Sequence, residues 1–175
     1  MHKVIRGPFL FFVFLLSACN FYNPFHFPTA EREPETNTPL SVVYTLRQAY
    51  ISQDLPLYLS CLERDSFRFY FNAQDTVVQH ILEVDLGIDS LVWGFEEEKK
   101  ATEALFELCS SIYLEYLNQT GFYSSDSMVF YFMANYYMVV TEQNGSSEIA
   151  EGKLLFQLKK IREKWFIVRW DDYPL

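Results

Sequence analysis

Three cysteines are the side chains of this 175-residue sequence whose chemistry is most easily assigned. Cys19 follows two small residues at the end of an apolar run, whereas Cys61 and Cys109 lie in the body of the chain. A thiol can be acylated, joined in a disulfide or used as a metal ligand, and its surroundings decide which. Cys61 and Cys109 form no metal-ligand spacing with His26 and His80, so we expect no metal site.

The beginning of the chain has the layout of an export signal. Lys3 and Arg6 precede the apolar stretch 9–16, and Ser17-Ala18 stand directly before Cys19. Eight apolar residues are too few to cross a bilayer, which takes about 20 in a helix, but they suit the core of a signal peptide. The arrangement resembles the signal and lipobox of bacterial lipoproteins. The resemblance implies that residues 1–18 are removed and that Cys19 is lipidated; an ordinary secretory signal cut after Ala18 is the alternative.

The lipoprotein resemblance also predicts where the protein resides. Two or more acyl chains anchor a protein stably to a membrane, so we expect a lipid-anchored protein of the bacterial cell envelope. Residue 20 is Asn, whereas an aspartate there commonly retains Gram-negative lipoproteins on the inner membrane. In a Gram-negative host this favours the periplasmic face of the outer membrane or the cell surface.

The charge of the mature chain argues against two classes of partner. Without residues 1–18 the chain has 12 basic and 23 acidic side chains, a formal charge of −11. Such a surface repels nucleic acid phosphates and anionic lipid headgroups. We therefore exclude nucleic acid and anionic lipid headgroups as main partners and expect the membrane to be reached through the lipid at Cys19.

The two remaining cysteines form an even pair in an oxidising compartment, where a disulfide can persist. Cys61 and Cys109 are 48 residues apart in the sequence, and a bridge over that distance would add about 3 to 4 kcal/mol in the chain-entropy model. The alternative is two buried free thiols.

The rest of the chain divides into a tether and one domain. Residues 19–38 combine an aromatic piece, 21–28, with a polar piece rich in Glu, Pro and Thr. Such a composition does not bury enough apolar surface to offset the entropy of ordering it. Residues 39–175 have dense apolar patterning without a break, which predicts a single domain.

The first half of this domain is predicted to be mainly helical. Thr38 can cap a helix beginning at Pro39, and Asp54 can cap a shorter helix that extends to Leu62. Residues 67–71 alternate as a half-buried strand does; the segment 74–92 is ambiguous. A firmer helix is expected over residues 96–106, with its three leading glutamates as a solvated first turn.

Strands follow to the end of the chain. We expect strands over 112–117, 127–141, 150–161 and 164–171, with a tight turn at Arg162-Glu163. Helices followed by an antiparallel meander indicate an α+β fold with helices on one sheet face. The strands are apolar on both sides, which predicts a homodimer or envelope-protein interface on the second face, or its coverage by loops or the tether.

Both ends of this domain resemble NTF2-like domains, the SnoaL and cystatin-like α+β group. The similarity lies in the motifs 49–55 and 67–71 and in the last hairpin, 152–156 with 164–172. It implies helices wrapped as a cone on a strongly curved, mainly antiparallel sheet, with a pocket between them and dimerisation through the sheet. Five aromatic residues are predicted to line that pocket: Phe67, Phe69, Phe71, Trp93 and Trp165.

No residue pattern identifies a catalytic site. The ionisable candidates are His80, Glu83, Asp85, Glu115, Asp126 and Arg169. None matches a catalytic motif, so no catalytic residue is assigned, and no sequence motif indicates a cofactor. For Arg169 we expect a structural contact with Asp171 or an aromatic ring, because the two residues share a nominal strand face with Trp165 and Ile167. The favoured function is a non-catalytic binding or assembly domain; the alternatives are binding of a small apolar ligand and a periplasmic isomerase or dehydratase.

Overall fold

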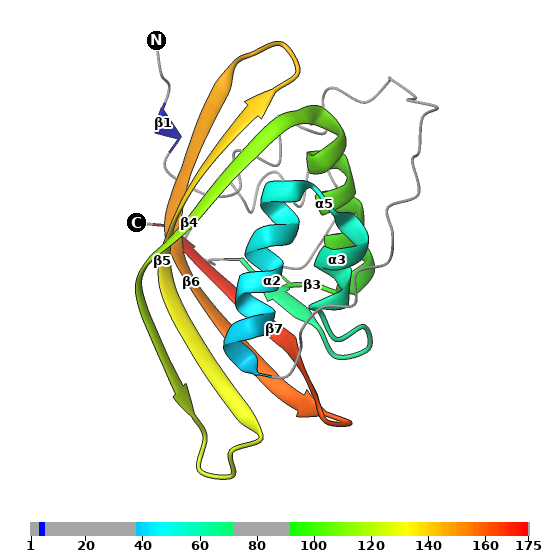
Figure 1. Ribbon diagram of the computed structural model, residues 1–175, viewed down its shortest axis with the longest axis vertical. Helices are drawn as coiled ribbons and strands as arrows, with labels where there is room; N and C mark the ends of the chain where they lie inside the picture. The colour runs from blue at the N-terminus through cyan, green and yellow to red at the C-terminus, as the bar shows by residue number, and fades with distance from the viewer. Residues whose placement is uncertain (1–3, 6–37, 72–91, 175) are drawn as a thin grey trace.

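The computed structural model describes residues 4–5, 38–71 and 92–174 (Figure 1). The predicted signal peptide and tether lie largely outside these residues, as do Cys19 and the ambiguous segment 74–91. Two residues of the predicted signal peptide are described: Val4–Ile5 form strand β1, which pairs in parallel with Ile149 and Ala150. No helix of the described part is long and apolar enough to cross a membrane.

Two capped helices begin the domain, as predicted. Helix α2, Pro39–Ser52, starts at Thr38, whose hydroxyl accepts a hydrogen bond from the Ser41 amide, and Pro39 fills the first turn, where no amide hydrogen is needed. Helix α3, Leu55–Ser60, starts at Asp54, whose carboxylate accepts from the Leu57 amide. The apolar stripe of α2 is buried, so this helix packs along its length against the sheet.

Helix α5, Phe95–Leu108, lies beside α3 (Figure 1). Its first turn holds Glu96, Glu97 and Glu98, which suit the positive end of a helix dipole. Glu97 accepts a hydrogen bond from the Gly94 amide, 3.1 Å away. The predicted solvated turn is wrong at its third residue, because Glu98 is only 5% exposed and points toward the sheet side of the helix.

The sheet is open and mainly antiparallel. Its order is β3-β2-β7-β6-β5-β4, with β2 and β7 the parallel pair among these strands. The strands are β2 Arg68–Tyr70, β3 Val92–Trp93, β4 Cys109–Tyr123, β5 Val129–Glu142, β6 Ser147–Ile161 and β7 Lys164–Pro174. Helices packed on one face of a bent sheet confirm the predicted α+β architecture (Figure 1).

Strand β4 is much longer than the predicted strand 112–117. Its pairing with β5 shifts between Leu117 and Thr120, where Asn118 adopts a left-handed backbone with φ of 52°. Such a bulge bends a strand without ending it, so the polar residues after Leu117 do not terminate β4. The tight turn at Arg162-Glu163 is confirmed: both residues have positive φ, 49° and 69°, as a two-residue hairpin requires.

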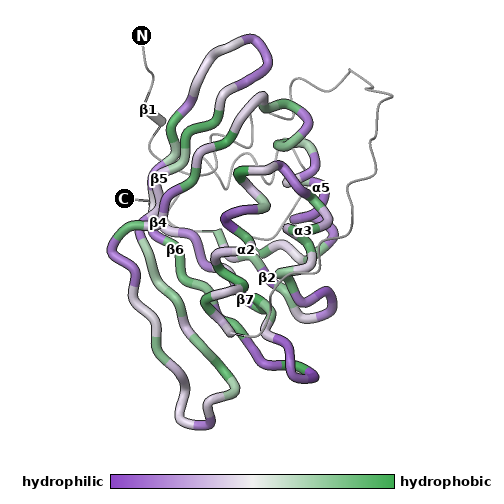
Figure 2. Tube along the Cα trace, viewed as in Figure 1, coloured by the Kyte–Doolittle hydropathy of each residue, from purple (hydrophilic) through white to green (hydrophobic). Residues whose placement is uncertain are grey.

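The core lies between the helices and the concave face of the sheet. Alternate residues of β5 and β6 are buried there, among them Phe132, Phe156 and Leu158. Figure 2 shows apolar segments along the strands and hydrophilic residues at the hairpin tips. The opposite, convex face includes the exposed side chains Tyr113 and Met133.

The cysteines of the domain are free thiols. Cys61, at the end of α3, contacts the Leu57 carbonyl, whereas Cys109 stands where α5 passes into β4. Burial raises the pKa of each thiol to about 12. The disulfide considered from the sequence is therefore absent from the structure, and both residues serve as small buried side chains.

Candidate functional site

A cavity of about 100 Å³, partly open to solvent, lies between helices α2 and α5 and the concave face of the sheet. Its walls are mostly apolar, and aromatic rings make up a large part of them. Buried polar side chains reach the cavity from α5 and from β7. The lining residues with aromatic or ionisable side chains are Tyr50, Phe69, Phe71, Trp93, Glu98, Tyr116, Tyr136, Trp170 and Asp172.

Glu98 is the carboxyl group on the helical wall. Its Oε1 atom accepts hydrogen bonds from the Tyr58 hydroxyl at 2.5 Å and from the Thr102 hydroxyl at 3.3 Å. Burial raises the pKa of Glu98 from 4.5 to about 7, although both hydrogen bonds act in the opposite direction. Glu98 can therefore hold or release a proton near neutral pH.

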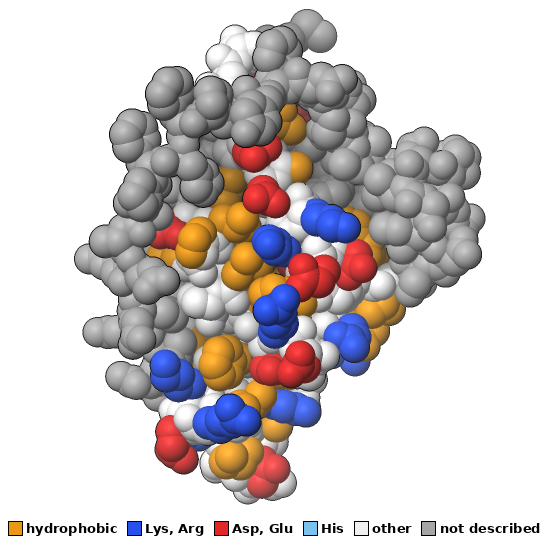
Figure 3. Space-filling model, turned by 90° about the vertical axis from the view of Figure 1, so that its right-hand side faces the viewer, with side chains coloured by type: hydrophobic (Ala, Val, Ile, Leu, Met, Phe, Trp, Pro, Cys, Tyr) orange, Lys and Arg blue, Asp and Glu red, His pale blue; other side chains and the backbone are white. Residues whose placement is uncertain are grey.

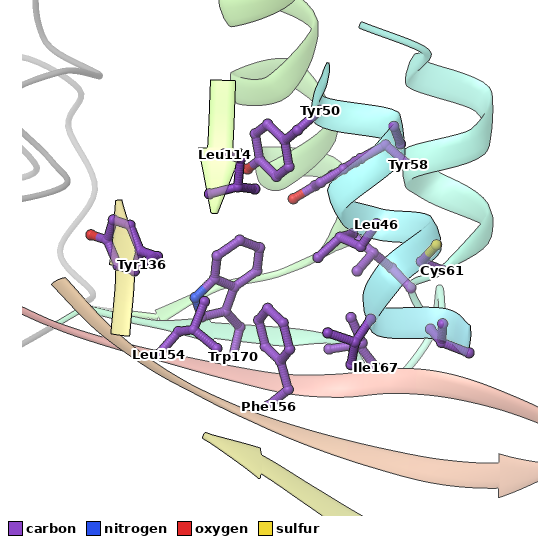
Figure 4. Close-up of a cluster of buried hydrophobic side chains, with 14 of the residues drawn as sticks. Leu46, Tyr50, Tyr58, Cys61, Leu114, Tyr136, Leu154, Phe156, Ile167 and Trp170 are labelled. Carbon is purple, nitrogen blue, oxygen red and sulfur yellow. The ribbon is translucent and has the colours of Figure 1, made fainter. Parts of the chain in front are cut away.

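Two tyrosines join Glu98 to helices α2 and α3. The Tyr50 and Tyr58 rings meet edge to face with centroids 5.1 Å apart. Figure 4 shows both side chains projecting from the helices toward Trp170. Burial, and then the nearby Glu98, raise the pKa of both hydroxyls well above 10, so both tyrosines stay protonated, and Tyr58 donates its proton to the hydrogen bond with Glu98.

The sheet contributes a second carboxyl group. Asp172 on β7 is 5% exposed, and Tyr136 on β5 is 6% exposed. Burial raises the pKa of Tyr136 well above its ordinary value, and the charge of Asp172 raises it further. The Tyr136 ring lies over Gly152, where a Cβ atom would come within 2.5 Å of the hydroxyl oxygen. A glycine is thus needed opposite Tyr136.

Aromatic rings form the remaining wall. Phe69 contacts both Phe71 and Trp170, with centroids 4.7 and 5.1 Å away, and Phe71 meets Trp93 edge to face at 4.7 Å. Three separate strands, β2, β3 and β7, supply Phe69, Trp93 and Trp170. The rings hold one another in fixed orientations, which favours a preformed wall.

The structure brings together three of the five aromatic residues predicted to line the pocket. Phe69, Phe71 and Trp93 lie in the cavity wall. Phe67 is fully buried in the core, and Trp165 packs against Tyr123 at a centroid distance of 6.0 Å, so neither belongs to the lining.

None of the ionisable candidates that the structure describes lies in the cavity. Glu115 accepts a hydrogen bond from the exposed Tyr113, and Asp126 accepts from Ser124 in the turn before β5. Arg169 binds Asp171 through two hydrogen bonds of 2.7 Å and lies 4.0 Å from the Tyr70 ring centroid. His80, Glu83 and Asp85 fall outside the described residues.

The face predicted for Arg169 is wrong in part. A register shift between Gln157 and Leu158 leaves Val168 as an extra residue on β7. Ile167 therefore packs in the core on the same side as Trp170, whereas Arg169 is exposed. The expected contacts of Arg169 with Asp171 and with an aromatic ring are both present.

Sequence reasoning missed both carboxyl groups of the cavity. Glu98 shares helical spacing with the buried residues Ala101, Thr102 and Leu105, and this was the available signal. Asp172 stands two residues after Trp170 on β7, but the irregularity at Val168 hides which face the two residues occupy.

The arrangement can bind a small apolar molecule and exchange a proton with it. Among the described residues, no group of three His, Cys, Asp or Glu side chains gathers as a metal site would require. On the side where α3 and α5 lie, Figure 3 shows acidic and basic side chains interspersed.

Solved structures with the same fold are similar to this chain across most of its length. A candidate aromatic ring hydroxylase from Novosphingobium aromaticivorans has a TM-score of 0.60 and 12% identity, covering 78% of this chain and 85% of its own. A candidate scytalone dehydratase from the same organism has a TM-score of 0.61 and 8% identity, covering 77% and 79%. An NTF2-like protein of unknown function from Pseudomonas putida has a TM-score of 0.56 and 10% identity, covering 77% and 82%.

These similarities show that the domain has the NTF2-like fold. The sequence matches no family model and no curated protein at a significant level. At 8 to 12% identity these similarities show the fold and do not show an activity.

Proposed function

We propose that this chain is a lipid-anchored protein of the bacterial cell envelope whose NTF2-like domain binds a small, mostly apolar molecule in the cavity between α2, α5 and the sheet. The observation that carries the binding proposal is the cavity itself, because its aromatic walls leave space instead of filling it. Ligand sites are typically apolar pockets with a few placed polar groups. Glu98, Trp170 and Asp172 are such groups here.

The size of the cavity limits the ligand. An engineered apolar cavity of about 150 Å³ binds benzene, and this one offers about 100 Å³ with an opening to solvent. A ligand with one ring therefore suits the space. One of the structurally similar proteins is named as a candidate aromatic ring hydroxylase, and this name is in line with a cyclic ligand for this chain.

Filling the cavity tests the binding proposal. Ala101 lines it from α5, whereas Ala104 on the same helix does not. We expect Ala101→Leu to weaken ethylbenzene binding at least tenfold because the added carbons occupy the ligand's space, and Ala104→Leu to leave it unchanged. Binding is followed by NMR titration of the full chain in nanodiscs, with empty nanodiscs as the blank. Absence of binding to the unsubstituted chain contradicts the proposal.

Proton transfer is the second candidate function, and the raised pKa of Glu98 favours it. A carboxyl group that titrates near pH 7 in an apolar site suits a general acid or base, as an isomerase or dehydratase needs. Acetophenone in D₂O offers a test, because a base that removes a methyl proton next to the carbonyl causes deuterium exchange there. Exchange that requires Glu98 and disappears in Glu98→Gln supports an enzyme; exchange at the solvent rate in both supports a binding protein.

The membrane anchor has its own test. Cys19→Ser removes the thiol that would carry lipid, so an unprocessed precursor without incorporated palmitate is expected. Radiolabelled palmitate that enters the variant as well as the original chain contradicts lipidation at Cys19.

The interface on the second sheet face stays a prediction. Exposed apolar side chains on or near that face include Tyr113, Leu117, Phe122 and Met133. They suit a homodimer or an envelope-protein partner. Light scattering of the full chain at high micromolar concentration checks the homodimer, and a monomer at that concentration contradicts it.

A further inference from the structure

The indole N–H of Trp170 is a buried hydrogen-bond donor without a partner among the described residues. Trp170 is 8% exposed and lines the cavity. Leaving a buried donor unmet costs free energy, and native proteins keep few such groups. A donor that persists at the wall of a ligand-sized cavity points to a ligand that satisfies it.

Trp170 is held in place on both sides. Its ring meets Phe156 edge to face at 4.8 Å and Phe69 at 5.1 Å. Figure 4 shows the indole nitrogen on the edge of the ring that faces Tyr136 and Leu154, and both of these residues line the cavity. The donor is therefore fixed in direction and opens toward the cavity, which is how a binding site selects a polar group.

The charges of the cavity restrict the ligand further. Glu98 and Asp172 both line the cavity and are buried. A negatively charged ligand would be repelled by either carboxyl group when that group is ionised, and burial of the ligand's charge would add to the cost. Since a donor N–H needs an acceptor, the ligand that fits carries an uncharged acceptor oxygen on an apolar body.

We infer that Trp170 is the specificity-determining residue of the cavity and that its indole N–H binds the acceptor oxygen of an uncharged single-ring ligand, such as an aryl ketone. This rests on the proposed function, because it presupposes that the cavity binds a small molecule. It adds the chemical class of that molecule and the atom that recognises it.

A matched pair of compounds tests the inference on the full chain in nanodiscs. Acetophenone and ethylbenzene have similar shapes, but acetophenone alone has an acceptor oxygen. In the unsubstituted chain, we expect acetophenone to shift the NMR signal of the Trp170 indole N–H proton downfield. Ethylbenzene should cause no downfield shift of this signal. Binding of acetophenone without that shift overturns the inference, even if no variant folds.

Substitution at Trp170 gives the energetic test. Trp170→Phe removes the N–H and keeps a ring, so we expect the affinity for acetophenone, relative to that for ethylbenzene, to fall about tenfold, the value of one hydrogen bond. The change in ring size acts on both compounds and cancels in the ratio. Trp165→Phe is the matched control, because this buried tryptophan lies outside the lining, and its ratio should stay unchanged.

The remaining outcomes separate the two proposals. If neither compound binds the unsubstituted chain, the proposed function fails, and the inference with it. If both bind and Trp170→Phe leaves the ratio unchanged, the inference alone is overturned. A ratio that falls in Tyr136→Phe but not in Trp170→Phe assigns the donor to the Tyr136 hydroxyl and also overturns it. Tightest binding of the cation 1-phenylethylammonium overturns the uncharged class.

Discussion

Asp171 and Asp172 follow one another on β7, but their carboxyl groups lie on opposite faces of the sheet. Asp171 receives both hydrogen bonds of Arg169, a side chain that is 44% exposed. Asp172 faces the cavity beside Tyr136. On the convex face an acidic group is thus matched by a cation, whereas on the concave face acidic groups meet hydroxyls and aromatic rings.

The difference shows where this fold tolerates the free-energy cost of desolvating a carboxyl group. Asp171 is itself only 5% exposed, and the two hydrogen bonds from the partly exposed Arg169 stabilise its charge. A carboxyl group in an apolar cavity loses hydration, which is why the pKa of Glu98 rises to about 7. Costs of this kind concentrate at functional sites, which supports the proposal that the cavity on the concave face binds a ligand.

The largest expected effect compares neighbouring residues on the two faces of β5. Phe132 is 1% exposed and contacts the Tyr116 and Phe156 rings, whereas Met133 is 38% exposed on the convex side. Phe132→Ala should lower the free energy of unfolding by about 3 to 5 kcal/mol, because it leaves a cavity. Met133→Ala should change it by about 0.5 kcal/mol or less. Urea unfolding measures both, and similar losses would contradict the comparison.

The second-largest effect is the pH dependence that Glu98 imposes on the free energy of unfolding. The folded chain keeps a proton on Glu98 up to about pH 7, while the unfolded chain releases it near 4.5. Because the folded state binds more protons in this window, stability falls as the pH rises from about 4.5 to 7, by about 3 kcal/mol in total.

A variant isolates this contribution. Glu98→Gln cannot ionise, so its unfolding free energy should lack that part of the decline between pH 4.5 and 7. Glu103→Gln, an exposed position on the same helix, serves as the control and should retain the decline. A Glu98→Gln chain whose pH profile parallels the original would show that Glu98 is not desolvated.

A smaller effect is expected from the hydroxyl that supports Glu98. Tyr58→Phe removes the hydrogen bond to Oε1 and should cost about 1 to 2 kcal/mol, because both groups are fully buried. It should also raise the pKa of Glu98, since this hydrogen bond favours the ionised form. Tyr113→Phe removes the corresponding bond to Glu115 on the exposed face and should leave unfolding unchanged. NMR titration of the Glu98 carboxyl gives the pKa; an unchanged value argues against the assigned role.

The helical and strand patterns predicted the fold because burial alternates regularly along most elements. The stripe of α2 and the alternation on β2 were readable for this reason, since each apolar position in them contributes to the core. The resemblance of both ends to NTF2-like domains identified the architecture. Strand β4 was predicted too short because the bulge at Asn118 continues a strand through polar residues.

The cavity was harder to predict, because its polar residues break the patterns that reveal an element. Three glutamates at a helix start look alike in sequence, and only the position of Glu98 above Ala101 and Thr102 separates it from Glu96 and Glu97. Trp170 and Asp172 change faces through an irregularity at Val168, which a strict alternation does not register. A site assembled from α5, β5 and β7 depends on such packing, and no single segment contains it.

The smallest expected effect concerns the ion pair on the convex face. Arg169→Lys keeps the positive charge but loses the planar fork that binds both oxygens of Asp171 and lies over Tyr70. The Arg169 side chain is 44% exposed, so we expect Arg169→Lys to lower the free energy of unfolding by less than about 1 kcal/mol. This loss should become smaller when NaCl is raised from about 0.05 M to about 0.5 M, since salt screens exposed charges. The stability cost of Tyr58→Phe, inside the core, should not change with salt. Unfolding of both variants at the two salt concentrations measures this; equal salt sensitivity would mean that the two faces do not differ in dielectric environment.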